Sequence, residues 1–250
     1  MLTALPVGRL AEATREDFPF VPPIGTVVVW HARAAGSTDL AQCLQSLLPD
    51  ERARADQFRH EEARADFVTT RAHLRVLLGQ CLGMAPSRVA LRTTAQGKPF
   101  LADWQNPSRL RFNVSHSHGH ILIALARGLE IGVDVEPVRS LPDMDAVARD
   151  VMTHEEHFLY DISRAKKPET FFRVWTRKEA ILKAAGCGLL HSLRQTESLL
   201  RRAAIQHQTR TGQPVTSLCR LRSFDTQTGA LGAIAARGGE FELQHFRMDC

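Results

Sequence analysis

Apolar and polar positions alternate with a period of two in several short stretches of this 250-residue chain. Such alternation turns every second side chain to the same face and is typical of β-strands. Together with the β-branched run at 26–30 and the continuously apolar runs at 120–126 and 230–236, it predicts strands over 26–30, 110–114, 120–126, 130–136, 216–223, 230–236 and 240–247. We interpret the last three as a three-stranded meander, because turn-forming residues separate them.

Longer amphipathic stretches predict helices over 49–82, 154–164 and 169–185. Pro49 suits the first position of a helix. Thr153 and Glu156 have the spacing of a capping box, and Gly186 is a typical helix-ending residue. The region 93–109 is rich in glycine, proline, aspartate and asparagine, which indicates a loop.

Two parts of the chain resemble each other. The segments 60–75 and 154–183 both contain His-Glu-Glu and, further on, Thr-Arg, and strands follow each of them. This suggests a duplicated α/β unit. We therefore predict two similar halves, residues 1–130 and 131–250, which form one compact unit.

Composition narrows the class of protein. With 44% hydrophobic and 24% charged residues, the chain falls in the ordinary globular range. Residues 1–20 carry five charges and no sustained apolar run, so we expect neither a signal peptide nor a membrane anchor. The five cysteines are scattered and form no CxxC pair, which favours a reducing, cytoplasmic environment.

The net charge of +5 is unevenly distributed. Residues 194–222 contain six arginines and one acid, Glu197. Such a segment could face an acidic partner or nucleic acid, and a solvated basic surface without a partner is the alternative. It contains no Trp, Tyr or Phe for base stacking, so we do not expect nucleic-acid binding.

The strand over 131–136 places two acids on one face. Asp134 and Glu136 alternate with Ile131, Val133 and Val135. Neighbouring carboxylates repel each other unless a cation neutralises them, and Mg²⁺ prefers such oxygen ligands. The alternative is an edge strand with two ordinary surface acids.

The helix over 169–185 carries a second candidate group. Trp175, Glu179 and Lys183 follow one another at steps of four residues and share one stripe. Glu179 and Lys183 could form an ordinary surface pair. The run of the stripe through Trp175 instead suggests a partly buried line, where charged groups need partners.

Hydroxyl and cationic groups precede these acids. Ser115, Ser117 and nearby backbone amides are suited to bind phosphate, with His116 adding charge when protonated and Lys98 supplying a compact cation on a turn. A three-histidine zinc pattern at 116, 118 and 120 is interrupted by the turn at Gly119, and we do not expect it to bind zinc.

Four motifs together resemble the signature of the Sfp-type 4′-phosphopantetheinyl transferases, in the order and at the spacing of that family. They are Gly97-Lys98-Pro99, Phe112-Asn-Val-Ser-His-Ser117, Gly132-Val-Asp-Val-Glu136 and Trp175-Thr-Arg-Lys-Glu-Ala-Ile-Leu-Lys183. The resemblance spans roughly residues 45–190. It implies a pseudo-twofold α/β (α+β) fold, in which each half has a small, mainly antiparallel sheet and a long helix.

The resemblance also implies the reaction. The phosphopantetheine arm of coenzyme A would move onto a serine of an apo acyl or peptidyl carrier protein, with release of adenosine 3′,5′-bisphosphate. Carrier proteins of fatty-acid, polyketide, siderophore and nonribosomal-peptide synthesis all fit this prediction. The enzyme would be cytoplasmic and monomeric, without a nucleic-acid or membrane partner.

Site residues carry over by position. Asp134, Glu136 and Glu179 would ligate Mg²⁺, with Mn²⁺ as an alternative. Ser115, His116 and Lys98 would hold the 3′-phosphate of coenzyme A, and Lys183 its pyrophosphate. Glu179 is also our candidate general base.

The chain departs from the family pattern in 51–67. Glu51, Asp66 and Phe67 occupy places where some relatives carry lysine, arginine or threonine, and substitutes could come from Arg54, Arg64 and Arg71. Three alternatives stay open: a different Mg²⁺-dependent phosphate-ester enzyme, a basic nucleic-acid-binding module, and a family member that binds coenzyme A without turnover.

Overall fold

The computed structural model describes residues 7–9, 21–95, 97–186, 193, 196, 219–226 and 229–248. The strands in these ranges are β1 Val7–Arg9, β2 Thr26–Arg33, β3 Leu91–Thr93, β4 Pro99–Leu101, β5 Leu110–Ser117, β6 His120–Arg127, β7 Glu130–Pro137, β8 Cys219–Asp225, β9 Ala230–Arg237 and β10 Glu242–Arg247. The α-helices are α1 Ser37–Ser46, α2 Pro49–Ala55, α3 Glu61–Leu82, α4 Met144–Val151, α5 His154–Ile162 and α6 Lys167–Ala185. Within the described residues, no helix is both long and apolar enough to cross a membrane.

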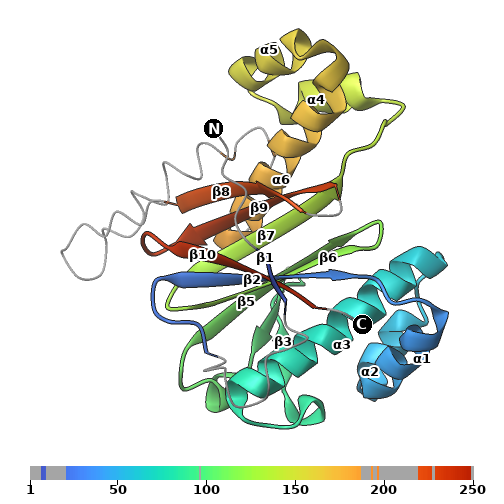
Figure 1. The fold of residues 1–250 in the computed structure, drawn as a ribbon, viewed down its shortest axis with the longest axis vertical. Helices are drawn as coiled ribbons and strands as arrows, with labels where there is room; N and C mark the ends of the chain where they lie inside the picture. Colours follow the sequence, from blue (N-terminus) through green and yellow to red (C-terminus); the bar gives the residue numbers. More distant parts are fainter. Residues whose placement is uncertain are drawn as a thin grey trace.

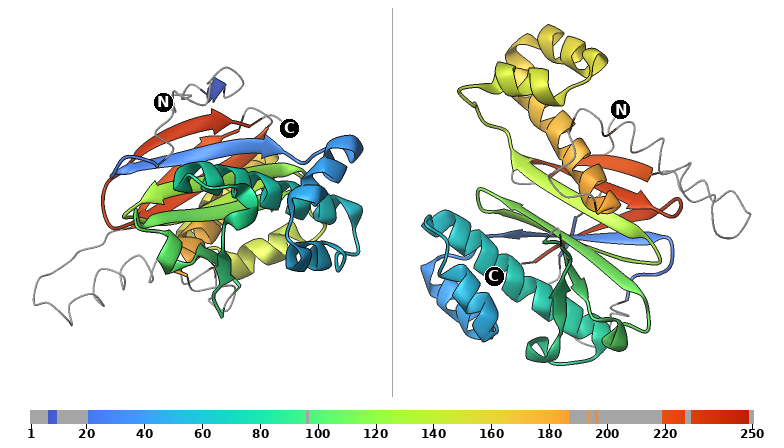
Figure 2. Two further views of the ribbon diagram at one scale, coloured as in Figure 1. Left: turned by 90° about the horizontal axis from the view of Figure 1, so that it is seen from below. Right: turned by 180° about the vertical axis from the view of Figure 1, so that it is seen from behind.

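Two sheets and two long helices make up the body of the molecule (Figures 1 and 2). One sheet has the strand order β1-β10-β2-β6-β5, and the other has the order β7-β9-β8. Helix α3 packs on the first sheet, and α6 packs on β7 and β9 of the second. This arrangement of two halves, each with a sheet and a long helix, confirms the predicted fold class.

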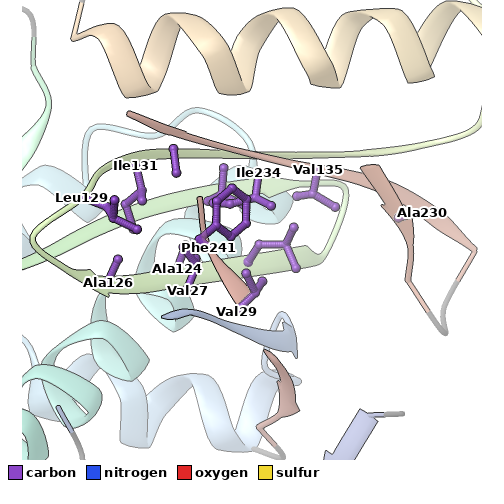
Figure 3. Close-up of a cluster of buried hydrophobic side chains, with 13 residues drawn as sticks. Val27, Val29, Ala124, Ala126, Leu129, Ile131, Val135, Ala230, Ile234 and Phe241 are labelled. Atoms are coloured by element: carbon purple, nitrogen blue, oxygen red, sulfur yellow. The ribbon is translucent and has the colours of Figure 1, made fainter. Parts of the chain in front are cut away.

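Alternation along β2 explains how the first sheet is buried on both faces. Val27 and Val29 point into the core between the sheets, which Figure 3 shows. Val28 and Trp30 point the other way, into the core shared with α3. Burying a side chain of this size contributes roughly 1.5–3 kcal/mol, so both faces hold the strand in place.

The same alternation along β7 creates the functional face. Val133 and Val135 enter the core between the sheets, so Gly132 and Asp134 point toward α6. A Cβ on Gly132 would lie 2.2 Å from the carbonyl oxygen of Ala180 and 2.3 Å from the amide nitrogen of Ala184. The missing side chain therefore lets the α6 backbone lie directly against β7.

Strand β7 is an edge strand of the second sheet, and its open edge faces β5 of the first. Side chains close this edge in place of a neighbouring strand. Asn113 Oδ1 accepts the Val133 amide at 2.8 Å. The Val133 carbonyl accepts Lys183 Nζ at 3.1 Å, and the Ile131 carbonyl accepts Lys98 Nζ at 3.2 Å. The Asn113 bond joins the two sheets, and the two lysine bonds fasten α6 and the turn between β3 and β4 to the edge of β7.

Some expectations from the sequence are wrong. The last three strands do not form a meander, because β10 leaves β9 and pairs in parallel with β2. Phe246 of β10 stacks on Trp30 of β2 with ring centroids 4.8 Å apart. The alternation of side chains along β10 is compatible with either sheet. The packing of Phe246 on Trp30 favours pairing with β2 in the first sheet. As a result, β10 lies within residues 131–250, the predicted second half, but it pairs with a strand of the first sheet. The boundary between the two halves at residue 130 stays a prediction.

The helix expected over 49–82 is two helices, α2 and α3. In the turn between them, Phe58 packs on Phe67 of α3 with ring centroids 5.2 Å apart. The expected loop over 93–109 contains β4, which pairs with β3. The predicted capping box is confirmed, since Thr153 Oγ1 accepts the amide of Glu156 and the Glu156 carboxylate accepts the amide of Thr153.

Candidate active site

Charged and hydroxyl side chains gather where the inner face of β5 meets β7. Residues 113, 115 and 117 of β5 lie at every second position of the strand and so point to one side. Two hydroxyls meet the two acids predicted from the sequence: Ser115 Oγ donates to Asp134 Oδ1 at 2.9 Å, and Ser117 Oγ donates to Glu136 Oε2 at 2.7 Å.

Lys183 of α6 completes the contact between the elements. Its Nζ lies 2.7 Å from Asp134 Oδ1 and 3.0 Å from Ser115 Oγ. The alternative of a solvated surface pair between Glu179 and Lys183 is wrong, because Glu179 is buried and Lys183 pairs with Asp134. The structure therefore brings Ser115, Asp134, Glu179 and Lys183 to one place.

Two carboxylate oxygens in this cluster are buried without a hydrogen-bond donor. Asp134 is 5% exposed and Glu179 is 8% exposed, so the alternative of ordinary surface acids is wrong for Asp134. Asp134 Oδ2 and Glu179 Oε1 are buried and accept no hydrogen bond within the described part of the molecule. A buried, unpaired carboxylate oxygen is costly, so both oxygens call for a cation or a proton.

Burial raises the pKa of Asp134 above its ordinary value, although the charge of Lys183 and the hydrogen bonds from Lys183 and Ser115 oppose this shift. Burial also raises the pKa of Glu179, and the negative charges of Asp134 and Glu136 add to the effect. The two acids thus lie close enough to repel each other.

A hard divalent cation would satisfy this pair, since carboxylate oxygens are its preferred ligands. Among the described residues, no three His, Cys, Asp or Glu side chains are grouped so that they could hold a metal ion as they stand. Glu136 already has two partners, Ser117 and Arg139, whose Nη1 lies 2.7 Å from Glu136 Oε2. Both partners contact Oε2 of Glu136, and the metal-ligand roles of Asp134, Glu136 and Glu179 stay a prediction.

His116 lies next to Ser115 on β5. Burial, together with the positive charges of Lys183 and Arg71, lowers its pKa to about 4. The imidazole is therefore neutral near pH 7 and can donate one N–H to an anion. Of the three arginines proposed as substitutes in 51–71, Arg71 is the one whose charge acts on His116; Arg54 bonds Gln57, and Arg64 bonds Asp56.

Lys98 reaches the same interface but contacts backbone. Its Nζ donates to the carbonyl oxygen of Lys183 at 2.7 Å and to that of Ile131 at 3.2 Å. The side chain lies between β7 and the last turn of α6, beside a cleft of about 400 Å³.

Two departures from the family pattern have structural reasons. Glu51 is buried and forms a bidentate ion pair with Arg75, at 2.7 and 2.9 Å. Asp66 accepts the Gly119 amide at 3.0 Å and thereby fixes the turn between β5 and β6. Gly119 has a φ of +75°, a conformation that favours glycine.

Sequence reasoning gave no role to Asn113 or Arg139. Asn113 stands inside a recognised motif, and its alternation with Ser115 and Ser117 was the available signal. Arg139 is three residues after Glu136, which is a weak signal outside a helix. The basic segment 194–222 lies outside the described residues except for Thr196 and 219–222.

Comparison with known proteins covers both halves. Residues 30–127 match the family model described as 4′-phosphopantetheinyl transferase, N-terminal. Residues 130–233 match the model of the 4′-phosphopantetheinyl transferase superfamily. The four motifs that carry the sequence resemblance therefore fall inside the matched regions.

Individual relatives agree with these matches. The chain is 40% identical to the 4′-phosphopantetheinyl transferase HetI of Nostoc sp. over 60% of this chain and 63% of HetI. It is 35% identical to a putative 4′-phosphopantetheinyl transferase of Synechocystis sp. over 60% of this chain and 62% of that protein. It is 30% identical to the human L-aminoadipate-semialdehyde dehydrogenase-phosphopantetheinyl transferase, over 62% of this chain and 53% of that protein.

The chain thus spans between 53% and 63% of the length of these relatives. The matched regions contain every residue of the cluster between β5, β7 and α6. On these matches, the chain belongs to the 4′-phosphopantetheinyl transferase superfamily.

Proposed function

We propose that this protein is a 4′-phosphopantetheinyl transferase that moves the phosphopantetheine arm of coenzyme A onto a serine of an apo carrier protein. The observation that carries the proposal is the buried cluster of Asp134, Glu179, Lys183 and Ser115. Two of its carboxylate oxygens lack a partner, and it lies on the motifs of the superfamily.

Coenzyme A would bind across the contact between β5 and α6. Ser115 and His116, supported by the charge of Arg71, would hold its 3′-phosphate. Lys183 would contact the pyrophosphate, for which its ammonium would turn from Asp134 toward the ligand. Asp134 and Glu179 would ligate Mg²⁺, with Mn²⁺ as an alternative, and Glu136 would support the site with its charge.

The reaction forms one bond and breaks another. The serine oxygen of the carrier attacks the β-phosphorus of coenzyme A, and the bond from this phosphorus to the bridging oxygen breaks, which releases adenosine 3′,5′-bisphosphate. When bound, Mg²⁺ would offset the charge on the pyrophosphate oxygens. Lys183 stabilises the negative charge that develops on the leaving phosphate.

Glu179 would take the proton of the attacking serine, directly or through a water. Its place beside Asp134 and Lys183 puts it within the cluster where the reaction would occur. A neutral His116 would donate an N–H to the phosphate and does not compete for this proton.

We also propose that the protein is a cytoplasmic monomer. Its basic segment 194–222 would contribute to docking an acidic carrier protein. Reversing Arg201 and Arg202 to glutamate should raise the KM for the carrier at low salt, with a smaller effect at high salt because salt screens the attraction. A KM that stays the same across a range of salt would remove this segment from docking.

The test incubates the protein with coenzyme A, Mg²⁺ and several apo carrier proteins, and measures their intact masses. We expect at least one carrier to gain a single phosphopantetheinyl group, and its serine-to-alanine variant to gain none. If every carrier stays unmodified while coenzyme A is hydrolysed, the protein is a different phosphate-ester enzyme.

Site variants sharpen this test. Asp134→Asn should abolish transfer and should also abolish the rise in Tm that Mg²⁺ produces in the presence of coenzyme A. Asp39→Asn, which removes an exposed acid from α1, is the matched control and should behave as the wild type. Equal Mg²⁺ responses in both variants would exclude Asp134 as a metal ligand.

A further inference from the structure

Three side-chain contacts connect β5 to β7, and they come from every second residue of β5. They are Asn113 with the Val133 amide, Ser115 with Asp134 and Ser117 with Glu136, at 2.8, 2.9 and 2.7 Å. The two strands belong to different sheets, and in the described part of the chain no ladder of backbone hydrogen bonds joins them. Side chains therefore set how β5 and β7 are aligned.

The Asn113 contact differs in kind from the other two. Ser115 and Ser117 donate to carboxylates, whose oxygens would take new partners when a cation and coenzyme A bind. Asn113 Oδ1 instead accepts a main-chain N–H, that of Val133. This N–H is uncharged and cannot ligate a cation, so the contact can stay in place while the others are exchanged.

Val133 is directly connected to the active site. Its carbonyl accepts Lys183 Nζ at 3.1 Å, and Asp134 follows it in the chain. Its side chain is fully buried in the core between the sheets. A shift of Val133 along β5 would therefore move Asp134 relative to Ser115. It would also change the 2.7 Å distance between Asp134 Oδ1 and the Lys183 ammonium.

Asn113 lies in the middle of β5, where asparagine is an unfavourable residue. It is 5% exposed, and a polar group at such a place needs a hydrogen bond. Its bond to the Val133 amide meets this need. An apolar side chain at position 113 would leave the buried Val133 N–H without its acceptor, which is also unfavourable. To satisfy this N–H, β7 would have to move relative to β5.

We propose that Asn113 is a positioning residue, which fixes the alignment of β5 with β7 and so holds Ser115, Asp134 and Lys183 at the distances that transfer requires. This role rests on the proposed transferase function. It gives Asn113 no contact with coenzyme A, with the cation or with the carrier protein, so its effect reaches the reaction only through the groups that it aligns.

Steady-state kinetics with Asn113→Leu tests this role. Leucine has nearly the size of asparagine and no acceptor for the Val133 amide. We expect kcat for carrier modification to fall about 10–100-fold, as for catalytic groups misplaced by about 1 Å, while the KM for the carrier stays at the wild-type value. A wild-type kcat in the folded variant would overturn the proposal.

Asn106→Leu is the matched control. Asn106 is a second buried asparagine, in the turn before β5, and its side chain makes two hydrogen bonds to the backbone of Leu110, at 2.8 and 2.9 Å. Its loss should lower Tm while kcat stays at the wild-type value. A general loss of stability would instead lower kcat in both variants alike, and this result would overturn the proposal.

Hydrogen exchange followed by NMR tests the contact without any turnover. In Asn113→Leu the amide of residue 133 should exchange faster than in the wild type, with no change in α5. Asn113→Asp keeps an oxygen acceptor and should retain slow exchange at this amide. Unchanged exchange at residue 133 in Asn113→Leu would overturn the proposal even if activity fell.

Two further outcomes are provided for. If Asn113→Leu does not fold, Asn113→Ala takes its place with the same measurements and the same expected results. If the wild-type protein modifies no carrier, the proposed function fails, and the exchange at residue 133 still decides whether Asn113 holds β7 against β5.

Discussion

At Gly132 the backbones of β7 and α6 lie directly against each other, and an added methyl group there should move them apart. In Gly132→Ala the new Cβ would lie 2.2 Å from the carbonyl oxygen of Ala180, 2.3 Å from the amide nitrogen of Ala184 and 2.7 Å from the carbonyl carbon of Lys183. All three are backbone atoms of α6, so no side chain can rotate away. Relief requires the helix itself to shift from β7.

The size of the shift follows from the contact distances. To extend the shortest contact from 2.2 Å to an ordinary 3.4 Å, α6 must recede by about 1.2 Å. Overpacking of this kind costs roughly 1–3 kcal/mol of unfolding free energy. For a chain of this size, that is a fall in Tm of about 2–12 °C. Displacing Glu179 and Lys183 by about 1 Å should lower kcat about 100-fold.

Two measurements check this reasoning: thermal unfolding followed by circular dichroism, and the rate of carrier modification followed by intact mass. Gly36→Ala is the matched control, because a Cβ there meets no atom within 4 Å. We expect it to keep the wild-type rate and nearly the wild-type Tm. If Gly132→Ala also kept both, the close packing of α6 on β7 would be refuted.

Three further predictions address other parts of the structure. Glu179→Gln should abolish carrier modification while Tm stays the same or rises, because it removes a buried charge; retained turnover would remove Glu179 from both proposed roles. Glu51→Gln should lower the unfolding free energy in urea by roughly 3–5 kcal/mol, since it leaves the buried Arg75 guanidinium without its ion-pair partner, whereas the exposed Asp50→Asn should leave it nearly unchanged. Burial lowers the pKa of His245 from its ordinary 6.5 to about 4, and that of His31, whose Nε2 lies 2.8 Å from His245 Nδ1, to about 3. Between about pH 4 and pH 6.5 the histidines of the unfolded chain therefore bind protons more readily than those of the folded chain. The folded protein is then fully stable above about pH 6.5 and loses stability as the pH drops toward 4. His245→Phe should make the fall in Tm over this pH interval smaller, and an unchanged slope of Tm against pH would contradict the prediction.

Most elements around the site could be predicted because local patterns determine them. The alternation over 130–136 fixes which side chains of β7 face the core, and that alone places Gly132 and Asp134 on the opposite face. The capping box at Thr153 and the glycine at 186 mark helix ends through local hydrogen bonds and backbone freedom. Such features need no knowledge of distant partners.

The remaining features depend on contacts between distant residues. The alternation along β10 does not indicate that it pairs with β2. A period of two predicts which side chains share one face of a sheet, but it does not predict which strand lies alongside. The same limit applies to Lys98. The motif around Lys98 indicates a cation on a turn. Lys98 is 85 positions from Lys183 in the sequence, so the sequence pattern does not predict its hydrogen bond to the Lys183 carbonyl. Asn113 was missed for this reason too, because its partner Val133 lies 20 positions away, whereas the partner of Arg139 is only three positions away and the spacing gives a weak signal outside a helix.

The parallel pairing of β10 with β2 has a consequence for how the protein acquires its shape. His31 and His245, which meet between these strands, are 214 positions apart. During synthesis, β10 is made after all three strands of the second sheet, so the first sheet can gain this inner strand only at the end. Closing so long a loop is slow, so we expect the two halves to mature together in one late step, and separately produced halves to remain incomplete until mixed.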